Sequence, residues 1–322
     1  MDPITHGALG AATAQLLLMK RDKKNAWLVG ALAAMAPDLD VFIRSQQDPM
    51  LILLYHRHFT HSLSFIPVGA FLVTLVLILF KPFRKQWYYT FLAALIGYST
   101  HGLLDACTSY GTLLFWPFNH ERVSLDLIAI IDPFFTVPII LGLVWTLVND
   151  NRIGVSIGLG LAGIFLLFNS FQHNRALAIT ESYSKENRIP ISRARSFPFL
   201  LSSTHWRSVV ETNNGFFIAD LYLPLMNKSE VTKVGKYPVF KKEDLPEFVK
   251  ISPGQLRDYK IFDWFSEGFV IIAARQPLIL VDGRYLVGEN PAIALWGIQF
   301  VPGQPHVKSV SGVKVFSKDH FN

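Results

Sequence analysis

The sequence contains a single cysteine, Cys107, among 322 residues, so no disulfide can form within the chain and cysteine usage does not indicate a redox compartment. Charged residues are also scarce, at 17% of the chain. The net charge is +6, but no basic patch with interleaved aromatic residues accompanies it, and we expect no nucleic-acid partner. We interpret the positive charge as a signal of membrane topology and as attraction to anionic lipid.

Hydrophobic residues, by contrast, make up 51% of the chain, and the mean hydropathy is +0.31. Soluble domains of this size rarely have a positive average, so the composition favours a membrane protein. The apolar residues are concentrated before about residue 172. The sequence therefore predicts a membrane domain over residues 1–172 and a soluble domain over residues 173–322. The first basic cluster follows the first apolar stretch, an order that is wrong for a secretory signal and predicts a retained first helix.

Apolar segments long enough to be helices recur through the first domain. They predict a polytopic α-helical membrane domain of about five to six helices. A full span needs about 20 residues, so the two segments nearest the N-terminus are short, and a re-entrant pair is the alternative for them. The segments are residues 4–19, 26–37, 63–80, 87–104, 133–148 and 153–171.

Basic residues gather in three of the connecting loops, at residues 20–25, 81–86 and 149–152. Along six spans these loops fall on the same side, and loops rich in lysine and arginine face the cytoplasm. The sequence thus predicts a multi-pass protein of the inner (cytoplasmic) membrane. The loops at 38–62 and 105–132 and the soluble domain are then expected on the extracytoplasmic side.

The soluble domain is predicted to be α+β or mainly β. Residues 216–223, 269–274 and 295–301 have the composition of strands, and residues 243–248 and 253–259 that of short helices. Asp282-Gly283 stands between two apolar runs, a pattern typical of a β-hairpin over residues 278–287.

The densest group of ligand-type side chains lies between His56 and Ser62, where three histidines and one arginine occur within seven residues. The predicted topology places this group on the outer face together with the other candidate residues of the membrane domain. His101 and Asp105 are spaced four apart and so share one face of a helix. The candidates outside the dense group are His6, Asp38, Asp40, His101, Asp105 and Asp132.

Imidazole nitrogens and carboxylate oxygens without thiolates are the ligands of zinc, manganese or non-haem iron. The candidates outnumber the three or four ligands that one ion needs, so either two ions or one ion with supporting His and Asp residues would account for them. Arg57 is predicted to clamp a phosphate or carboxylate group. Asp38 or Asp40 is a candidate general base.

Each candidate also has a purely structural interpretation. His6 can be an interfacial residue, Asp38 and Asp40 a solvated turn, and His101 with Asp105 a hydrogen-bonded pair between helices. Asp132 before Pro133 can be an N-cap. It is their convergence on one face that favours a metal site. The remaining histidines are predicted to be surface or structural residues: His120, His173, His205, His306 and His320.

Several motifs follow one another in the first part of the chain. They are Met1-Asp2-Pro3-Ile4-Thr5-His6, Pro37-Asp38-Leu39-Asp40, His56-Arg57 with Phe59-Thr60-His61-Ser62, His101-Gly102-Leu103-Leu104-Asp105, Thr108 with Gly111, and Trp116-Pro117-Phe118. Their order resembles the YdjM-like family of membrane-bound proteins described as metal-dependent hydrolases. The resemblance covers residues 1–118 and implies a site of His6, Asp38, Asp40, His56, His61, His101 and Asp105. It also implies that His58 is not an essential ligand, because the family has a small residue there.

The resulting hypothesis is a membrane-bound hydrolase in which a metal-activated water attacks an ester or phosphoester, for example in a lipid, at the extracytoplasmic face. Zinc is the expected metal, with manganese and iron as alternatives, and the lipid bilayer is the expected partner. Two other classes remain open. One is an ion- or proton-coupled transporter, since His and Asp chains in membranes also carry protons and cations. The other is a membrane-anchored scaffold with a structural metal site.

Overall fold

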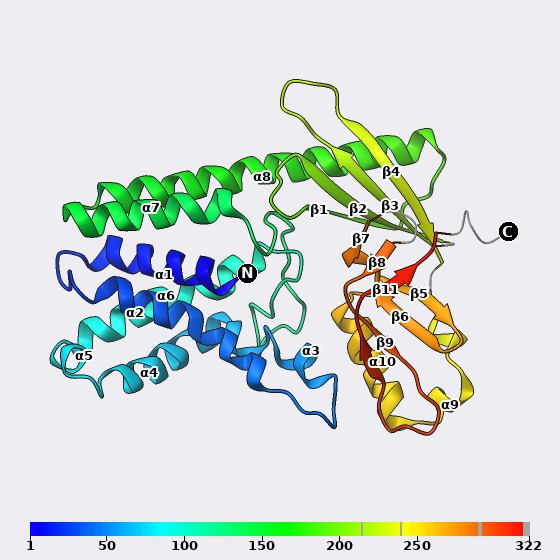
Figure 1. The fold of residues 1–322 in the computed structure, drawn as a ribbon, viewed down its shortest axis with the longest axis horizontal. Coiled ribbons are helices and arrows are strands. Elements are labelled where there is room, and N and C mark those ends of the chain that lie inside the picture. The colour runs from blue at the N-terminus through cyan, green and yellow to red at the C-terminus, as the bar shows by residue number, and fades with distance from the viewer. Residues whose placement is uncertain (214, 239, 289–291, 318–322) are drawn as a thin grey trace. The chain divides into compact units, whose positions relative to one another are not determined.

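The computed structural model describes residues 1–213, 215–238, 240–288 and 292–317, and the chain divides into two compact units (Figure 1). The first, which we call the helical unit, comprises Met1–Val41, Tyr55–Asn174 and Phe197–Ser203. The second, the sheet unit, comprises Phe42–Leu54, Arg175–Ser196 and the described chain from Thr204 onward. A helical N-terminal region followed by a β-sheet region is the order that the sequence predicts.

The helical unit is a bundle of helices. Its long helices are α1 (Pro3–Leu18), α2 (Ala26–Met35), α4 (Ile66–Leu77), α6 (Trp87–Ala106), α7 (Pro133–Asn149) and the first part of α8 (Ile153–Glu186). A long segment without helices, residues 107–132, connects α6 to α7. Shorter elements lie between the other helices: η1 (Ala36–Phe42), η2 (Phe59–His61), η3 (Leu63–Phe65) and α5 (Lys81–Lys85), while α3 (Leu51–Tyr55) belongs almost entirely to the sheet unit.

Helices α1, α2 and α6 form the centre of the bundle, while α4 packs on α6 and α7 packs on α1. The central helices approach closely because glycines meet at their crossing. A β-carbon on Gly10 or on Gly97 would collide with the carbonyl oxygen of Gly30. Small residues at the contact are how helices pack tightly where hydrophobic burial alone gives little driving force.

Replacing Gly97 with alanine is therefore expected to destabilise the bundle by about 1–3 kcal/mol, the usual cost of overpacking. The new methyl group would press on the backbone of α2, which cannot move aside as a flexible side chain would. The matched control is Gly160→Ala in α8, where a β-carbon has no neighbour within 4 Å. Denaturation of both variants in detergent measures the difference, and equal stability would contradict the close-packed crossing.

The number of membrane spans differs from the sequence prediction of five to six. In the described chain one helix, Ile153–Glu186, is long and apolar enough to cross a bilayer. The pair Leu51–His61 and Leu63–Leu77, bent by 60°, adds a second if it is counted as one span. The other predicted spans are too short or too polar: α1 has 16 residues, α2 has 10 and α7 has 17, and α6 carries His101 and Asp105.

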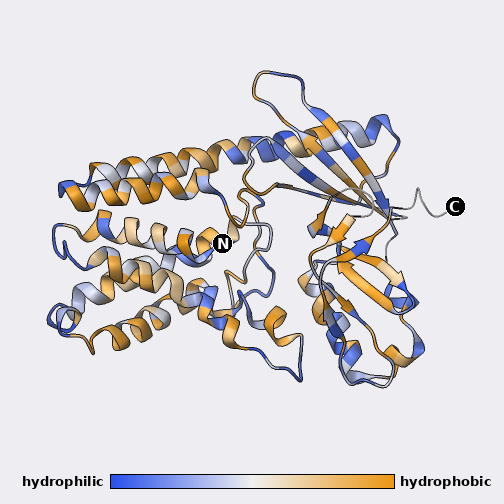
Figure 2. Ribbon diagram, in the orientation of Figure 1, coloured by the Kyte–Doolittle hydropathy of each residue, from blue (hydrophilic) through white to orange (hydrophobic). Residues whose placement is uncertain are grey.

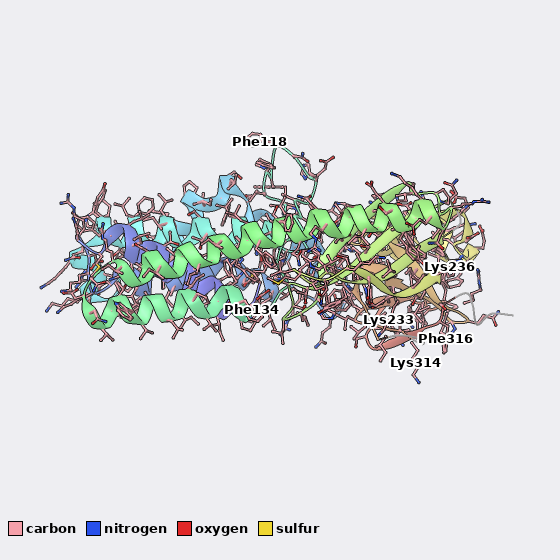
Figure 3. All side chains as sticks on the ribbon, turned by 90° about the horizontal axis from the view of Figure 1, so that it is seen from above. Phe118, Phe134, Lys233, Lys236, Lys314 and Phe316 are labelled. Atoms are coloured by element: carbon pink, nitrogen blue, oxygen red, sulfur yellow. The ribbon has the colours of Figure 1, made fainter. Side chains whose placement is uncertain are left out.

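The outer helices nevertheless expose large apolar side chains in stripes. Figure 2 shows that hydrophobic residues predominate along α7 and the adjoining part of α8. On α8 the stripe recurs every three or four residues, and a similar stripe on α7 begins at Phe134, which is labelled in Figure 3. Stripes of this size on a water-exposed face would be an aggregation hazard, whereas they suit contact with lipid. The α8 stripe consists of Ile153, Ile157, Leu161, Ile164, Leu167 and Phe171, and the α7 stripe of Phe134, Val137, Leu141, Val144 and Val148.

The sheet unit contains three sheets and a small number of helices. The first sheet has the order β1-β2-β3-β4, the second β10-β9-β6-β5 and the third β11-β8-β7. The strands are β1 (Arg193–Pro198), β2 (His205–Thr212), β3 (Gly215–Tyr222), β4 (Glu230–Tyr237), β5 (Val270–Arg275), β6 (Leu278–Asp282), β7 (Leu286–Val287), β8 (Ala292–Ala294), β9 (Gly297–Gln299), β10 (Lys308–Val310) and β11 (Val313–Val315). The helices are η4 (Lys242–Asp244), α9 (Glu247–Lys250), α10 (Pro253–Phe265) and η5 (Gly283–Tyr285).

The predicted strands at 216–223 and 269–274 are confirmed by β3 and β5, whereas the predicted hairpin over 278–287 is wrong. Strand β6 pairs with β5 and β9, and β7 pairs with β8 instead. Asp282-Gly283 does not form a two-residue turn with positive φ. The Asp282 carboxylate accepts hydrogen bonds from the backbone N–H and the guanidinium of Arg284. Asp282 thereby caps the start of the 3₁₀ helix η5.

Candidate metal centre

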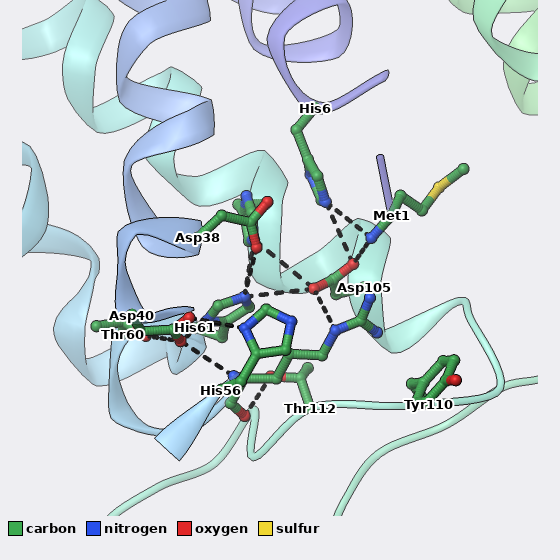
Figure 4. A network of polar contacts seen from close by, with 12 residues as sticks. Met1, His6, Asp38, Asp40, His56, Thr60, His61, Asp105, Tyr110 and Thr112 are labelled. Atoms are coloured by element: carbon green, nitrogen blue, oxygen red, sulfur yellow. Dashed lines mark hydrogen bonds and ion pairs between the residues drawn. The ribbon is translucent and has the colours of Figure 1, made fainter. Parts of the chain in front are cut away.

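Four side chains of the helical unit bring one ligand atom each to within 4.8 Å of one another (Figure 4). Asp38 comes from η1, His61 from η2, and His101 and Asp105 from α6. His61, His101 and Asp105 are fully buried, and the Asp38 side chain is 20% exposed. Asp38 is thus the member of the set that is partly exposed.

The local backbone explains why these residues converge. His101 and Asp105 lie one helical turn apart on α6, so both project from the same face. Between them Gly102 faces η2, and a β-carbon there would collide with the carbonyl oxygen of His61. The absence of a side chain at this position lets α6 bring its two ligands up to His61.

The hydrogen bonds around the two imidazoles fix which nitrogen carries a proton. Nδ1 of His101 lies 2.6 Å from the carbonyl oxygen of Ala34, which only accepts, so this nitrogen donates and Nε2 holds a lone pair. The Thr60 hydroxyl donates to Asp40 at 2.8 Å and is therefore left to accept from Nδ1 of His61 at 3.0 Å. Nε2 of His101 consequently presents a lone pair, and it forms a 2.8 Å hydrogen bond with Nε2 of His61, which carries the shared proton.

The two carboxylates complete a set of four electron-pair donors. Nε2 of His61 lies 3.6 Å from Oδ1 of Asp38 and 3.4 Å from Oδ2 of Asp105. Nε2 of His101 lies 3.5 Å and 3.6 Å from the same two oxygens. Tetrahedral zinc with ligands near 2.0–2.1 Å places neighbouring ligand atoms about 3.3 Å apart. The spacing of this set therefore fits one small divalent ion.

Asp40 lies beside this set and orients its neighbours. Its Oδ1 accepts from Nδ1 of His56 at 2.7 Å, and its Oδ2 accepts from the backbone N–H of Arg57 at 3.0 Å. Oδ2 also lies 3.3 Å from Nδ1 of His61. Burial disfavours the ionised carboxyl, but the two histidines outweigh burial and hold the pKa of Asp40 below its usual range. A carboxylate behind a ligating histidine is a frequent feature of metal sites.

Asp38 is held in its ionised form in the same way. Burial alone would raise the pKa of its carboxyl, yet the contacts with His101 and His61 lower it well below the usual range. The carboxylate is thus kept charged, which is the form that binds a cation.

Arg57, predicted as an anion clamp, is itself largely buried and held by the protein. Its Nε lies 3.3 Å from Oδ2 of Asp105, and Nη1 donates to the Thr108 hydroxyl at 2.9 Å. The guanidinium also lies over the ring of Tyr110. Its backbone is left-handed, with φ of 65°, and the N–H bond to Asp40 accompanies this conformation. In this arrangement Arg57 balances the charge of Asp105.

His6 and His56 lie next to the four-residue set without belonging to it. The rings of His6 and His101 are stacked, with their centroids 3.7 Å apart. Nε2 of His6 lies 3.2 Å from Oδ1 of Asp105. The same oxygen pairs with the amino group of Met1. His56, with a side chain 33% exposed, turns Nδ1 to Asp40.

The two remaining candidates lie apart from the set. His58 is half-buried among aromatic rings. Its ring centroid lies 5.8 Å from that of Trp116 and 6.0 Å from that of Phe59. Asp132 is the N-cap of α7 and accepts from the backbone N–H of Phe134 at 3.0 Å. Burial raises the pKa of the Asp132 carboxyl to about 6.

Sequence reasoning missed a second group of ligand-type atoms, in the sheet unit, formed by Asp48, Asp258 and His306. His306 was predicted to be a surface or structural residue, but its Nδ1 lies 2.9 Å from the buried Asp258. Nη1 of Arg257 lies 2.8 Å from Asp48 and 3.5 Å from Asp258, so a cation of the protein already sits between the two carboxylates. More than 200 residues separate Asp48 from Asp258, and no local spacing links them in the sequence. His320 lies outside the described residues.

Comparison with known proteins places the helical region in a family. A family model described as YdjM inner membrane protein matches residues 1–176. The chain is also 25% identical over 316 residues to the uncharacterized protein YfhP of Bacillus subtilis (strain 168), an alignment that covers 92% of this chain and 90% of YfhP. No solved structure matches the chain.

Proposed function

Because the chain belongs to the family of the YdjM inner membrane protein, we propose that it is an inner-membrane, metal-dependent hydrolase. Its metal centre is formed by Asp38, His61, His101 and Asp105. Its substrate class is an ester or phosphoester carried by a lipid.

The observation that carries this proposal is the convergence of four electron-pair donors in a buried site. Two carboxylates and two imidazoles this close need a positive charge between them, which the proton held between the two Nε2 atoms supplies in the metal-free chain. A divalent cation can displace this proton and be bound by all four side chains. Arg57 touches Asp105 alone of the four, so it does not occupy the common centre. A divalent ion there would lower the pKa of water and polarise a carbonyl or phosphoryl oxygen, which are the two requirements of hydrolysis.

The residues around the centre have separate tasks in this proposal. Asp40 keeps Nδ1 of His61 protonated and so directs Nε2 at the ion, and the Ala34 carbonyl does the same for His101. Arg57 keeps Asp105 ionised within a buried site. Asp38, the partly exposed member, lies where a substrate would enter.

The lipid assignment is supported by the surroundings of the centre. The outer helices of the same unit carry stripes of exposed apolar side chains that suit hydrocarbon. The basic loops lie at the end of the bundle away from the centre, where Lys23 pairs with Asp150 across two of them. With those loops in the cytoplasm and α8 crossing the bilayer, the centre lies on the extracytoplasmic side.

The test is to purify the full chain in detergent, load it with zinc, and measure release of fatty acid and phosphate from mixed phospholipid micelles. Activity is expected with zinc, is lost with a chelator, and returns when zinc is restored. His61→Ala is expected to be inactive and His58→Ala to be close to wild type. Hydrolysis that persists in the chelated protein, or none under any metal, would overturn the proposal.

The near-complete burial of three of the four ligands also favours a second candidate, a structural metal site in a membrane scaffold. The same preparation separates the two functions. A scaffold would bind zinc and lose thermal stability on chelation, but it would release neither fatty acid nor phosphate.

A further inference from the structure

The point where α8 leaves the bilayer can be located from its exposed face. The stripe of large apolar side chains starts at Ile153 and ends at Phe171, and the same face then carries Asn174, Arg175 and Ala178. Residues 153–171 span about 28 Å at 1.5 Å per residue, which matches a hydrocarbon core of about 30 Å. The headgroup region therefore begins directly after Phe171.

One loop of the sheet unit is fastened to α8 just beyond that point. Residues 224–229 connect β3 to β4, and Arg175 holds both ends of this loop. Its Nη2 donates to the carbonyl oxygen of Pro224 at 3.2 Å and to the hydroxyl of Ser229 at 3.0 Å. Arg175 lies four residues, or about 6 Å, beyond Phe171, so the loop is held at the level of the headgroups.

The composition of this loop is wrong for a turn in water. Leu225 is 66% exposed and Met226, at its tip, is 98% exposed. Lys228 follows them and is also exposed. Two large apolar side chains followed by a cation form the pattern of an interfacial anchor, in which the apolar groups enter the acyl boundary and the lysine meets anionic headgroups.

A second loop, which belongs to the helical unit, is also hydrogen-bonded to α8. Residues 199–203 lie between β1 and β2, and Nε2 of Gln172 donates to the carbonyl oxygen of Ser203 at 3.0 Å. Leu200 is 60% exposed and Leu201 is 56% exposed. Gln172 directly follows Phe171, so this loop too is tied to α8 at its exit from the apolar region.

We propose that loops 199–203 and 224–229 insert Leu200, Leu201, Leu225 and Met226 into the membrane interface where α8 leaves the bilayer. The partner is the lipid surface, enriched in anionic headgroups at Lys228. This inference rests on α8 crossing the membrane and does not depend on the metal centre.

The test uses the full chain with Cys107→Ser, a single new cysteine carrying an environment-sensitive fluorophore, and nanodiscs of phosphatidylcholine and phosphatidylglycerol. Met226→Cys and Leu200→Cys are expected to show blue-shifted emission. Both are also expected to be quenched by nitroxides on the lipid acyl chains, consistent with insertion of roughly 5–10 Å. The matched control is Asn213→Cys, exposed in the turn at the opposite end of β2 and β3, which is expected to respond only to a water-soluble quencher.

Adding Arg175→Ala to Met226→Cys is expected to weaken lipid quenching, because the tether of loop 224–229 is lost while its apolar tip is kept. If Met226→Cys and Leu200→Cys match Asn213→Cys in both quenching measurements, the loops lie in water and the proposal is overturned. Neither result depends on bound metal or on hydrolysis, so failure of the proposed function would leave this experiment interpretable.

Discussion

Replacing His101 with alanine is expected to abolish stoichiometric zinc binding. The substitution removes one of the two Nε2 atoms that face each other across the centre and leaves a cavity where the ring packed between His6 and His61. The affinity is expected to fall by more than the roughly 10–100-fold that follows loss of an orienting partner. Metal content by mass spectrometry and competition with a fluorescent chelator measure the change.

Two further variants make this result specific. His58→Ala removes an imidazole that lies outside the four-residue set and is expected to bind zinc like wild type. Asp40→Asn keeps all four ligands but weakens the orientation of His61, and an intermediate loss of about 10–100-fold is expected. Undiminished zinc binding by His101→Ala would show that the metal, if bound, lies elsewhere, for example at Asp48, Asp258 and His306.

Replacing Arg284 with alanine is expected to destabilise the sheet unit by about 3–5 kcal/mol, because it leaves the buried carboxylate of Asp282 without its partner. Arg284 is buried and pairs with Asp282 at 2.7 Å and Glu267 at 2.9 Å. Burial opposes its charge, but these carboxylates outweigh burial and keep the pKa of Arg284 above its usual value. Nη2 also donates to the carbonyl oxygen of Phe265 at 2.7 Å, and this hydrogen bond is lost as well.

The matched control for this prediction is Lys250→Ala, which removes an exposed pair with Glu247 at 3.9 Å. A surface pair of this kind contributes at most about 1 kcal/mol. Chemical denaturation followed by the near-ultraviolet signal of the sheet unit compares the two variants. Comparable stability of Arg284→Ala and Lys250→Ala would contradict a structural role for the buried pair.

Local sequence patterns predicted those features that depend on neighbours along the chain. The spacing of His101 and Asp105 placed both on one face of α6, and both contribute to the four-residue set. The Asp282-Gly283 pattern gave a wrong prediction of a hairpin over residues 278–287. The local preference of these two residues for a hairpin turn was outweighed by the pairing of Asp282 with Arg284.

Local hydropathy also did not predict how many of the apolar segments are long enough to span a membrane. The sequence predicts α1 and α2 as short membrane helices, but apolar residues of such helices can face either lipid or neighbouring helices. In the structure many of them are buried within the bundle, among them Ala11, Ala12, Ala33 and Ala34. A run of apolar residues has the same appearance in either setting, since both remove the side chains from water. Only the packing of the bundle separates the outer stripes of α7 and α8 from the buried centre.

By itself the sequence determined that the chain has an apolar helical region followed by a sheet region, and that His and Asp side chains concentrate in the first. The tertiary structure decided which of them share a centre. It set Asp38, His61, His101 and Asp105 around one point, and placed Asp40 behind His61 as an orienting partner. The reason is that ligand geometry depends on contacts between η1, η2 and α6, which lie far apart in the chain and are brought together by packing at glycines that no spacing rule reveals.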